Sequence, residues 1–302
     1  MSALRSWLFV PGDSDKKLNK GVGSGADALI LDLEDSVAKV NKSAARQLVR
    51  TFLVERPRST RKSQLWVRIN PLDSPDALSD LVAVVGADPD GVMLPKASGP
   101  ADLLRLSHYL DALEAAEGGA VSGKSAAPAK ILPVATETAA AAFRLGDYAT
   151  AHVPRLFGLT WGAEDLSAAV GASTNLDASG QWAFTYQLVR SLCLLGARAA
   201  GVEPIDTLFV NFKDEAGLRA SSRQSRAEGF TGRLAIHPAQ VAIINESYRP
   251  TPDEVEHAQR VIAAFAADPQ AGTVGLDGKM LDAPHLQQAR DLLANAKAYA
   301  SR

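Results

Sequence analysis

The 302-residue sequence has little cysteine, no excess of one charge and no long apolar run. Its single cysteine, Cys193, excludes an internal disulfide framework and a multi-cysteine metal site. With 32 lysines and arginines against 34 aspartates and glutamates, the chain has no overall field that would attract nucleic acid or a membrane surface. No segment approaches the roughly 20 apolar residues of a membrane span. We therefore expect neither a nucleic-acid partner nor a membrane partner.

The N-terminus shows no export signal. Residues 1–6 lead directly into a short apolar run that ends at Pro11 and Gly12, so the apolar core and cleavage site of a signal peptide are missing. The apolar fraction of 46% is sufficient for a sizeable core. We therefore expect a globular, cytoplasmic protein.

Short apolar segments of strand length recur along the first 240 residues. Most are continuous rather than alternating, which is typical of strands that are covered on both faces. They lie at 7–10, 28–33, 65–69, 91–94, 131–135, 156–161, 205–210 and 234–236, and helical periodicity is present at 43–53, 77–85, 101–116, 138–148, 181–200 and 214–228. Eight strands that alternate with helices predict an α/β fold, and eight is the number that closes a (β/α)8 TIM barrel.

The pattern changes after His237 and Pro238. A helix is predicted at 254–267, a glycine-containing stretch at 268–278 and a last helix at 284–299. This tail is too short and too rich in alanine to form a core of its own. We therefore assign residues 1–245 to a barrel catalytic domain and residues 246–302 to a C-terminal helical extension that packs on the barrel or on a neighbouring subunit.

Carboxylates follow several of the predicted strands. In a parallel barrel the C-terminal strand ends meet at one face, where functional groups lie. Glu137 and Asp165 each follow a buried strand, and oxygen ligands without cysteine or clustered histidine suit Mg²⁺. The alternative for Asp165 is a helix cap before Leu166. The pairing of the two carboxylates favours a metal site.

Two cationic side chains belong to the same predicted face. The planar guanidinium of Arg68 suits an anionic or carbonyl oxygen of a substrate, and a salt bridge to Asp32 or Glu34 is an alternative compatible with that role. Lys96 follows the fourth predicted strand, where a lysine can form a Schiff base with a carbonyl substrate. An ion pair with a neighbouring strand-end carboxylate is the alternative that we prefer.

Three further lysines follow the first predicted strand. Lys16, Lys17 and Lys20 are assigned to the first loop, beside Pro11 and Gly12, at the mouth of the barrel. Cations at this position could hold a phosphate-bearing ligand.

Short motifs occur in a fixed order from about residue 5 to residue 296. They are the segments 5–12, 32–37, 137–139 and 229–232 together with Arg68-Ile69-Asn70, Leu94-Pro95-Lys96, Gly162-Ala163-Glu164-Asp165 and Ile236-His237-Pro238. The ordered set resembles the citrate lyase β-subunit-like family, which includes malyl-CoA and citramalyl-CoA lyases. The resemblance implies a (β/α)8 barrel and Mg²⁺-dependent cleavage or formation of a C–C bond in a β-hydroxyacyl-CoA.

The resemblance also implies roles at the reacting centre. Glu137 and Asp165 would be the Mg²⁺ ligands, and Arg68 would hold the substrate oxygen. We assign Glu34 and Asp32 to the orientation of Arg68 and of metal-bound water.

Outside this centre, the resemblance implies a binding arm and a donated acid. Phe9, Lys16 and Lys20 would lie along the arm of coenzyme A, with Ile236 and His237 at its far side. Some relatives have tyrosine at the position of Phe9. Asp282, in the tail, matches a catalytic acid/base that lyase relatives take from an adjacent subunit, so the resemblance implies a homo-oligomer such as a trimer or hexamer.

The predicted activity is therefore a Mg²⁺-dependent acyl-CoA lyase of the citramalyl-CoA or malyl-CoA type. It would pass through a thioester enolate and give a 2-oxo acid and an acyl-CoA. Two alternatives stay open: a citrate lyase β-subunit that acts on an acyl-carrier-protein thioester, and a malyl-CoA thioesterase. A non-enzymatic CoA-binding module is disfavoured because the catalytic carboxylates and Arg68 are all present.

Overall fold

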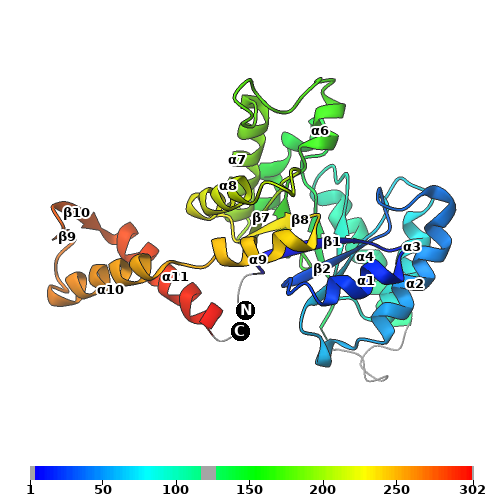
Figure 1. Cartoon of the computed structure of the whole chain (residues 1–302), viewed down its shortest axis with the longest axis horizontal. Coiled ribbons are helices and arrows are strands. Elements are labelled where there is room, and N and C mark those ends of the chain that lie inside the picture. Colours follow the sequence, from blue (N-terminus) through cyan, green and yellow to red (C-terminus); the bar gives the residue numbers. More distant parts are fainter. Residues whose placement is uncertain (1–3, 117–126, 301–302) are drawn as a thin grey trace. The chain divides into compact units, whose positions relative to one another are not determined.

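The structure is a computed structural model, and it describes residues 4–116 and 127–300. Contacts within the chain divide it into two compact units, Leu4–Ile244 and a C-terminal unit that starts at Asn245. The first unit runs from blue to yellow in Figure 1, and the helices and hairpin of the second run from orange to red.

The first unit is a parallel eight-stranded barrel with helices around it (Figure 1). Its strands are β1 (Ser6–Pro11), β2 (Ala28–Asp32), β3 (Gln64–Arg68), β4 (Gly91–Leu94), β5 (Lys130–Pro133), β6 (Gly158–Thr160), β7 (Glu203–Asp206) and β8 (Gly232–Ala235). They pair in the order β5-β4-β3-β2-β1-β8-β7-β6. Parallel bridges of Ile131 with Leu156 and of Val134 with Thr160 join the two ends. The predicted (β/α)8 barrel is confirmed.

Helices follow the strands. They are α1 (Asp15–Val22), α2 (Lys42–Val54), α3 (Ala77–Val84), α4 (Pro100–Ala116), α5 (Ala139–Ala142), α6 (Glu164–Ala169), α7 (Phe184–Ala199), α8 (Glu215–Glu228) and α9 (Pro238–Ser247). Side chains cap several of them: Ser14 accepts a hydrogen bond from the Lys17 amide at the start of α1, and Asp214 accepts one from the Gly217 amide at the start of α8. Within the described ranges, no helix combines the length and the apolar character that a membrane crossing requires.

Two predictions about helices are wrong. Lys16, Lys17 and Lys20 lie in helix α1 rather than in a loop, because the Ser14 cap allows the helix to begin at Asp15. The helix predicted over 138–148 is divided into the short α5 and a 3₁₀ helix, Leu145–Ala149. Gly146 lowers the helix propensity in the middle of this segment.

Three aromatic rings pack edge to face in the barrel core. Trp7 on β1 and Trp66 on β3 have ring centroids 5.0 Å apart, and Phe157, just before β6, lies 5.5 and 5.2 Å from them. The two indoles are essentially fully buried. Gly91 on β4 is required beside them, because a Cβ atom there would lie 2.3 Å from the Trp66 ring. The continuous apolar strands therefore form a close-packed core, as their sequence pattern predicts.

The seventh and eighth predicted strands are displaced along the chain. β7 ends at Asp206 and β8 spans Gly232–Ala235, so the predicted strand boundary at residue 210 is wrong. After Asp206 the chain leaves the sheet, and the apolar Leu208 packs against the barrel core from the connecting segment. The apolar run over 205–210 therefore belongs partly to a strand and partly to a loop.

The C-terminal unit consists of α10 (Pro252–Ala267), β9 (Thr273–Leu276), β10 (Lys279–Asp282) and α11 (Ala283–Ala300). A capping box between Thr251 and Glu254 starts α10. The antiparallel β9–β10 hairpin was not predicted, although its Asp277-Gly278 turn, with both residues at positive φ, is a typical hairpin signal. Four buried side chains, Ala258, Val261, Leu281 and Ala289, give this unit a small core, so the prediction that the tail forms no core of its own is wrong.

Asp206 is a fully buried carboxylate inside the first unit. It accepts hydrogen bonds from Trp161 Nε1 (2.7 Å), from Arg233 Nη2 (2.9 Å) and from two nitrogens of Arg190 (3.1 and 3.2 Å). Burial by itself would raise the pKa of Asp206, but the charges of Arg233 and Arg190 outweigh it and hold the pKa at about 2. The carboxylate therefore stabilises the fold at neutral pH, and this contribution is lost as the pH falls from about 4 toward 2.

We expect Asp206→Asn to lower the free energy of unfolding at pH 7 by about 3–5 kcal/mol, because two arginines lose their buried counter-charge. Urea unfolding followed by tryptophan fluorescence measures the loss. Glu55→Gln is the control, since Glu55 forms an ion pair whose carboxylate side chain is 62% exposed. An Asp206→Asn midpoint equal to that of wild type would contradict the stabilising role.

Candidate active site

Arg68 and Asp32 form the central contact of the C-terminal strand ends. They are register partners on the adjacent strands β3 and β2, so both side chains leave the sheet on the same side. Arg68 Nε and Nη2 donate to the two oxygens of Asp32 at 2.7 and 2.6 Å, and Asp32 is 1% exposed. Burial would raise the pKa of Asp32, but the hydrogen bond and charge of Arg68 keep it below its ordinary value. The pair is a buried, bidentate ion pair.

Glu34 and Phe9 complete the surroundings of the Arg68 guanidinium. Glu34 Oε2 lies 2.8 Å from Arg68 Nη1, and the Phe9 ring centroid lies 4.7 Å from the guanidinium carbon. The two hydrogen bonds to Asp32 use the Nε–H and one N–H of Nη2, while Nη1 faces Glu34 at ion-pair distance, so each terminal nitrogen keeps at least one N–H for another partner. Arg68 can therefore bind a further oxygen without giving up its carboxylate partners. Both salt bridges considered for it, to Asp32 and to Glu34, are present.

The ammonium of Lys96 lies among carboxylates. Its Nζ is 2.6 Å from Glu34 Oε1, 3.3 Å from Asp165 Oδ1 and 3.6 Å from Asp35 Oδ2. The predicted ion pair is therefore present. Burial would lower the pKa of Lys96, but the hydrogen bond to Glu34 and the nearby negative charges raise it above its ordinary value. A lysine that keeps its proton is a poor nucleophile, so the structure argues against Schiff-base chemistry.

Glu137 lies in the connection after β5 and is 6% exposed. The backbone N–H of Lys96 donates to its Oε2 at 2.5 Å. A Cβ atom at Gly162 would lie 3.0 Å from Glu137 Cγ, so the glycine gives this carboxyl group its room. Burial, and then the negative charges of Asp165 and Glu34, raise the pKa of Glu137 to about 8. The raised pKa shows that the positive charges near Glu137 do not offset its burial and its acidic neighbours.

Asp165 is the second residue of α6, and its side chain is 35% exposed. The N-cap residue is Ala163, and no side chain caps this helix. The helix-cap alternative for Asp165 is therefore wrong. Through Lys96, the structure connects Asp165 to the same cluster as Glu34 and Glu137.

Sequence reasoning missed a support for the loop that carries Glu34. Lys42 Nζ donates to the carbonyl oxygens of Leu33 (3.0 Å) and Glu34 (3.2 Å) and to Asn70 Oδ1 (2.6 Å). Asn70 in turn donates to the buried Asp80 at 2.6 Å. Asn70 belongs to the motif Arg68-Ile69-Asn70 of the sequence analysis, but Lys42 and Asp80 lie in helices α2 and α3, and nothing in the local sequence connects them to Asn70.

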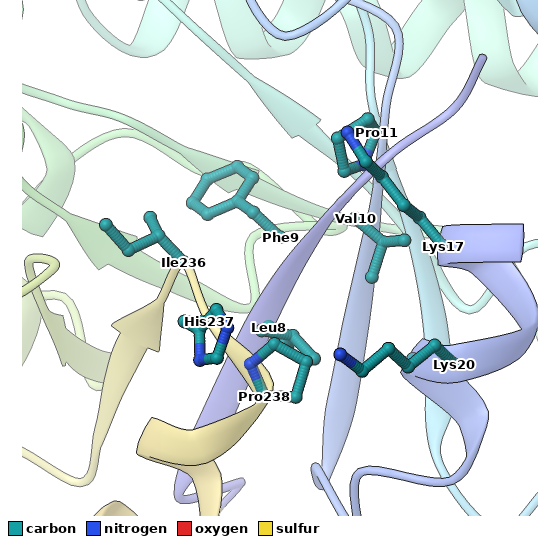
Figure 2. A pocket seen from close by; sticks show the side chains of 10 residues that line it. Leu8, Phe9, Val10, Pro11, Lys17, Lys20, Ile236, His237 and Pro238 are labelled. Atoms are coloured by element: carbon teal, nitrogen blue, oxygen red, sulfur yellow. The ribbon is translucent and has the colours of Figure 1, made fainter. Parts of the chain in front are cut away.

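A pocket of about 290 Å³ lies beside this cluster, between α1 and the start of α9. Figure 2 shows Lys17 and Lys20 of α1 on one side and Ile236 and His237 on the other, with Phe9 between them. Four of the five residues predicted to contact coenzyme A therefore line one pocket. Lys16 lies on α1 but is not among the lining residues, and Lys17 is in its place.

An aromatic residue that the sequence did not single out extends this wall. The Phe212 ring stacks on His237 with centroids 4.9 Å apart and an interplanar angle of 22°. Phe212 is 43% exposed. Nothing in the local sequence connects it to a residue 25 positions further on.

Asp282 belongs to the C-terminal unit, where it ends β10. Its Oδ1 lies 2.5 Å from Nδ1 of His285, in the first turn of α11, and both side chains are about half exposed. The carboxylate is therefore held by a local contact within its own unit.

Fold and site together define a (β/α)8 barrel with an arginine–carboxylate cluster at the C-terminal strand ends and a lysine-bearing pocket beside it. The chain belongs to the HpcH/HpaI aldolase/citrate lyase family, whose model matches residues 5–238. It is 38% identical over 299 residues to a (3S)-malyl-CoA thioesterase of Cereibacter sphaeroides, covering 98% of this chain and 96% of that protein.

Two further relatives extend the comparison. A mitochondrial citramalyl-CoA lyase of Rattus norvegicus is 32% identical, with 97% of this chain and 86% of the relative covered. The crystal structure of CitE from Mycobacterium tuberculosis in complex with magnesium, acetoacetate and coenzyme A matches with a TM-score of 0.81 and 32% identity, over 98% of both chains. The family resemblance drawn from the sequence is confirmed.

We expect Lys96 to form no covalent adduct with a carbonyl compound, because its ammonium is held in three ion pairs. Incubation with pyruvate and sodium borohydride, followed by peptide mass spectrometry, should leave Lys96 unmodified. A reduced pyruvyl adduct on Lys96 would establish the Schiff-base alternative instead.

Proposed function

We propose that this protein is a Mg²⁺-dependent lyase that cleaves or forms the C–C bond of a β-hydroxyacyl-CoA of the citramalyl-CoA or malyl-CoA type. The observation that carries the proposal is the convergence of Arg68, Glu137 and Asp165 on one face of the barrel beside a pocket with two lysines. Retro-aldol chemistry without a Schiff base can use this combination, because charge develops on oxygen atoms at both ends of the breaking bond.

The acidic cluster fits a magnesium ion. Mg²⁺ takes oxygen ligands, commonly one or two carboxylates, with water and substrate in its other positions. Glu137 and Asp165 would be those ligands. The described residues contain no group of three or more acidic, histidine or cysteine side chains preformed as a metal cage, and two carboxylates are enough for Mg²⁺. The incompletely compensated charge at Glu137 supports a cation there. When bound, the ion would act as a Lewis acid on substrate oxygens.

Arg68 would stabilise the thioester enolate. Cleavage needs a base for the proton of the β-hydroxyl group, and a carboxylate of the acidic cluster would accept it. The oxygen then becomes the carbonyl of a 2-oxo acid, and the electrons of the broken C–C bond move onto the thioester, whose oxygen becomes negative. The second N–H groups on the terminal nitrogens of Arg68 can donate to that oxygen. Asp32 and Glu34 hold the guanidinium in place at 2.6–2.8 Å, so it need not reorganise during the reaction.

The enolate carbon then requires a proton. We assign this step to Asp282, supplied by a neighbouring subunit in a homo-oligomer such as a trimer or hexamer. In the condensation direction the same carboxylate would remove a proton from the acyl-CoA methyl group. His285, 2.5 Å from Asp282, is placed to fix the orientation of the carboxylate.

The pocket would hold the arm of coenzyme A. Lys17 and Lys20 suit its phosphate groups, while Phe9 and Ile236 offer apolar surface. Binding a carrier far from the reacting bond fixes the position of the acyl group relative to Arg68. The coenzyme A in the CitE complex named above supports this assignment.

A second candidate is hydrolysis of the thioester, which the 38% identical malyl-CoA thioesterase favours. A site that polarises a thioester carbonyl can admit water as the nucleophile. The two reactions differ in the fate of sulfur, because a lyase leaves coenzyme A esterified and a thioesterase releases a free thiol.

We expect Glu137→Gln and Asp165→Asn each to reduce kcat/KM for citramalyl-CoA or malyl-CoA cleavage by about a hundredfold or more, because each removes a metal-binding oxygen charge. Formation of 2-oxo acid with added MgCl₂ measures the rate. Glu164→Gln is the matched control, since Glu164 is the neighbouring carboxylate and bonds only Asn175 in the described hydrogen bonds. Full wild-type activity in excess EDTA would contradict the metal assignment.

We expect the wild-type reaction to form acyl-CoA and 2-oxo acid in equal amounts, without release of a free thiol. A thiol reagent together with chromatography of the CoA products measures both. Thiol release without 2-oxo acid would establish the thioesterase instead. Turnover of an acyl-carrier-protein thioester but of no CoA ester would establish a citrate lyase β-subunit.

A further inference from the structure

Lys96 occupies the centre of the acidic cluster with a single positive charge. Its ammonium contacts Glu34, Asp35 and Asp165, which leave the barrel after β2 and in α6. Asp165 is also one of the two side chains assigned to Mg²⁺. Because Nζ is only 3.3 Å from Asp165 Oδ1, a divalent ion bound to the same carboxylate would face the ammonium at short range.

The backbone of Lys96 has a different role from its side chain. Lys96 is one of the non-glycine residues at positive φ, with φ = +52°, a conformation that is rare for such residues. In this conformation its N–H donates to Glu137 Oε2. The backbone amide of Lys96 therefore orients Glu137, and its ammonium neutralises Asp165. A side-chain substitution that keeps a Cβ changes only the second role.

The side chain can leave the cluster. One third of it is exposed, and a lysine stem has four flexible carbons that allow its ammonium to move into water. Arg68, in contrast, is fixed by three short contacts and is 13% exposed. Of the two cations in the cluster, Lys96 is thus the one that can move away.

We propose that Lys96 is a place-holding cation in the acidic cluster. When no metal is bound, its ammonium pairs with Glu34, Asp35 and Asp165; when Mg²⁺ binds, the ammonium moves away. Lys96 therefore competes with Mg²⁺ and lowers the affinity of the protein for the ion. This inference rests on the proposed function, which assigns Mg²⁺ to Glu137 and Asp165. It also explains how the carboxyl groups of Asp32, Glu34, Asp35, Glu137 and Asp165 can lie together in the folded protein without a bound metal ion. The consequence is a site that empties and refills readily instead of retaining its ion.

Calorimetric titration of the full-length protein with MgCl₂ tests the proposal. Lys96→Met removes the charge and keeps both the stem and the backbone amide. We expect its dissociation constant for Mg²⁺ to be about tenfold lower than that of wild type, because the competing like charge is gone. Lys96→Arg keeps a cation and should stay near the wild-type value. Lys62→Met is the matched control, since it removes an exposed lysine two residues before β3, at the opposite end of the strand from Arg68.

Thermal unfolding gives a second readout. Without metal, Lys96→Met should unfold at a lower temperature than wild type, because the carboxylates repel one another, and saturating MgCl₂ should abolish the difference. Lys96→Gln, a neutral variant with a polar side chain, replaces Lys96→Met if the latter does not fold. The place-holder proposal is wrong if wild type binds Mg²⁺ and the neutral variants bind it with the same or a lower affinity. That outcome leaves the proposed function intact. Absence of Mg²⁺ binding by every variant, wild type included, overturns both.

Discussion

The pairing of Arg68 with Asp32 is the contact on which the arrangement of the site depends. Parallel strands bring their C-terminal ends to one face, and in this barrel that face carries five carboxyl groups: Asp32, Glu34, Asp35, Glu137 and Asp165. Such a set would repel itself without cations among its members. Arg68 pairs with Asp32 and Glu34, and Lys96 pairs with Glu34, Asp35 and Asp165. Two cations thus face five carboxyl groups, and among the described residues no ion pair reaches Glu137, which accepts only the backbone N–H of Lys96. The proposed metal site follows from this uneven distribution of charge.

The same barrel uses the same residue types for a different purpose near β7. Asp206 also lies at a strand end and pairs with two arginines, yet it is completely buried and donors from Trp161, Arg190 and Arg233 surround it. Because the oxygens of Asp206 are buried and its charge is neutralised by two arginines, this carboxylate cannot bind a ligand. It stabilises the fold instead. Exposure and charge balance, rather than residue type, separate the two clusters.

The sequence predicted the barrel because continuous apolar strands and intervening helices are local patterns, and each of the eight strands has one. It also predicted that Arg68, Glu137 and Asp165 belong together, because parallel topology brings strand ends to one face. What it could not predict depends on packing. The Asp206 cluster, the support of Glu34 by Lys42 and Asn70, and the stacking of Phe212 on His237 join residues whose contacts have no periodic signal. The Asp277-Gly278 turn, in contrast, carried a recognisable signal that was missed.

The central claim is that Glu137 and Asp165 bind a divalent cation beside Arg68. Crystals grown with Mn²⁺, which prefers the same oxygen ligands as Mg²⁺, locate the ion directly by its anomalous scattering. The account predicts one anomalous peak in contact with carboxylate oxygens of both Glu137 and Asp165, with the Lys96 ammonium displaced from Asp165. A fully occupied peak elsewhere on the molecule, or no peak between these two carboxylates at saturating Mn²⁺, would contradict it.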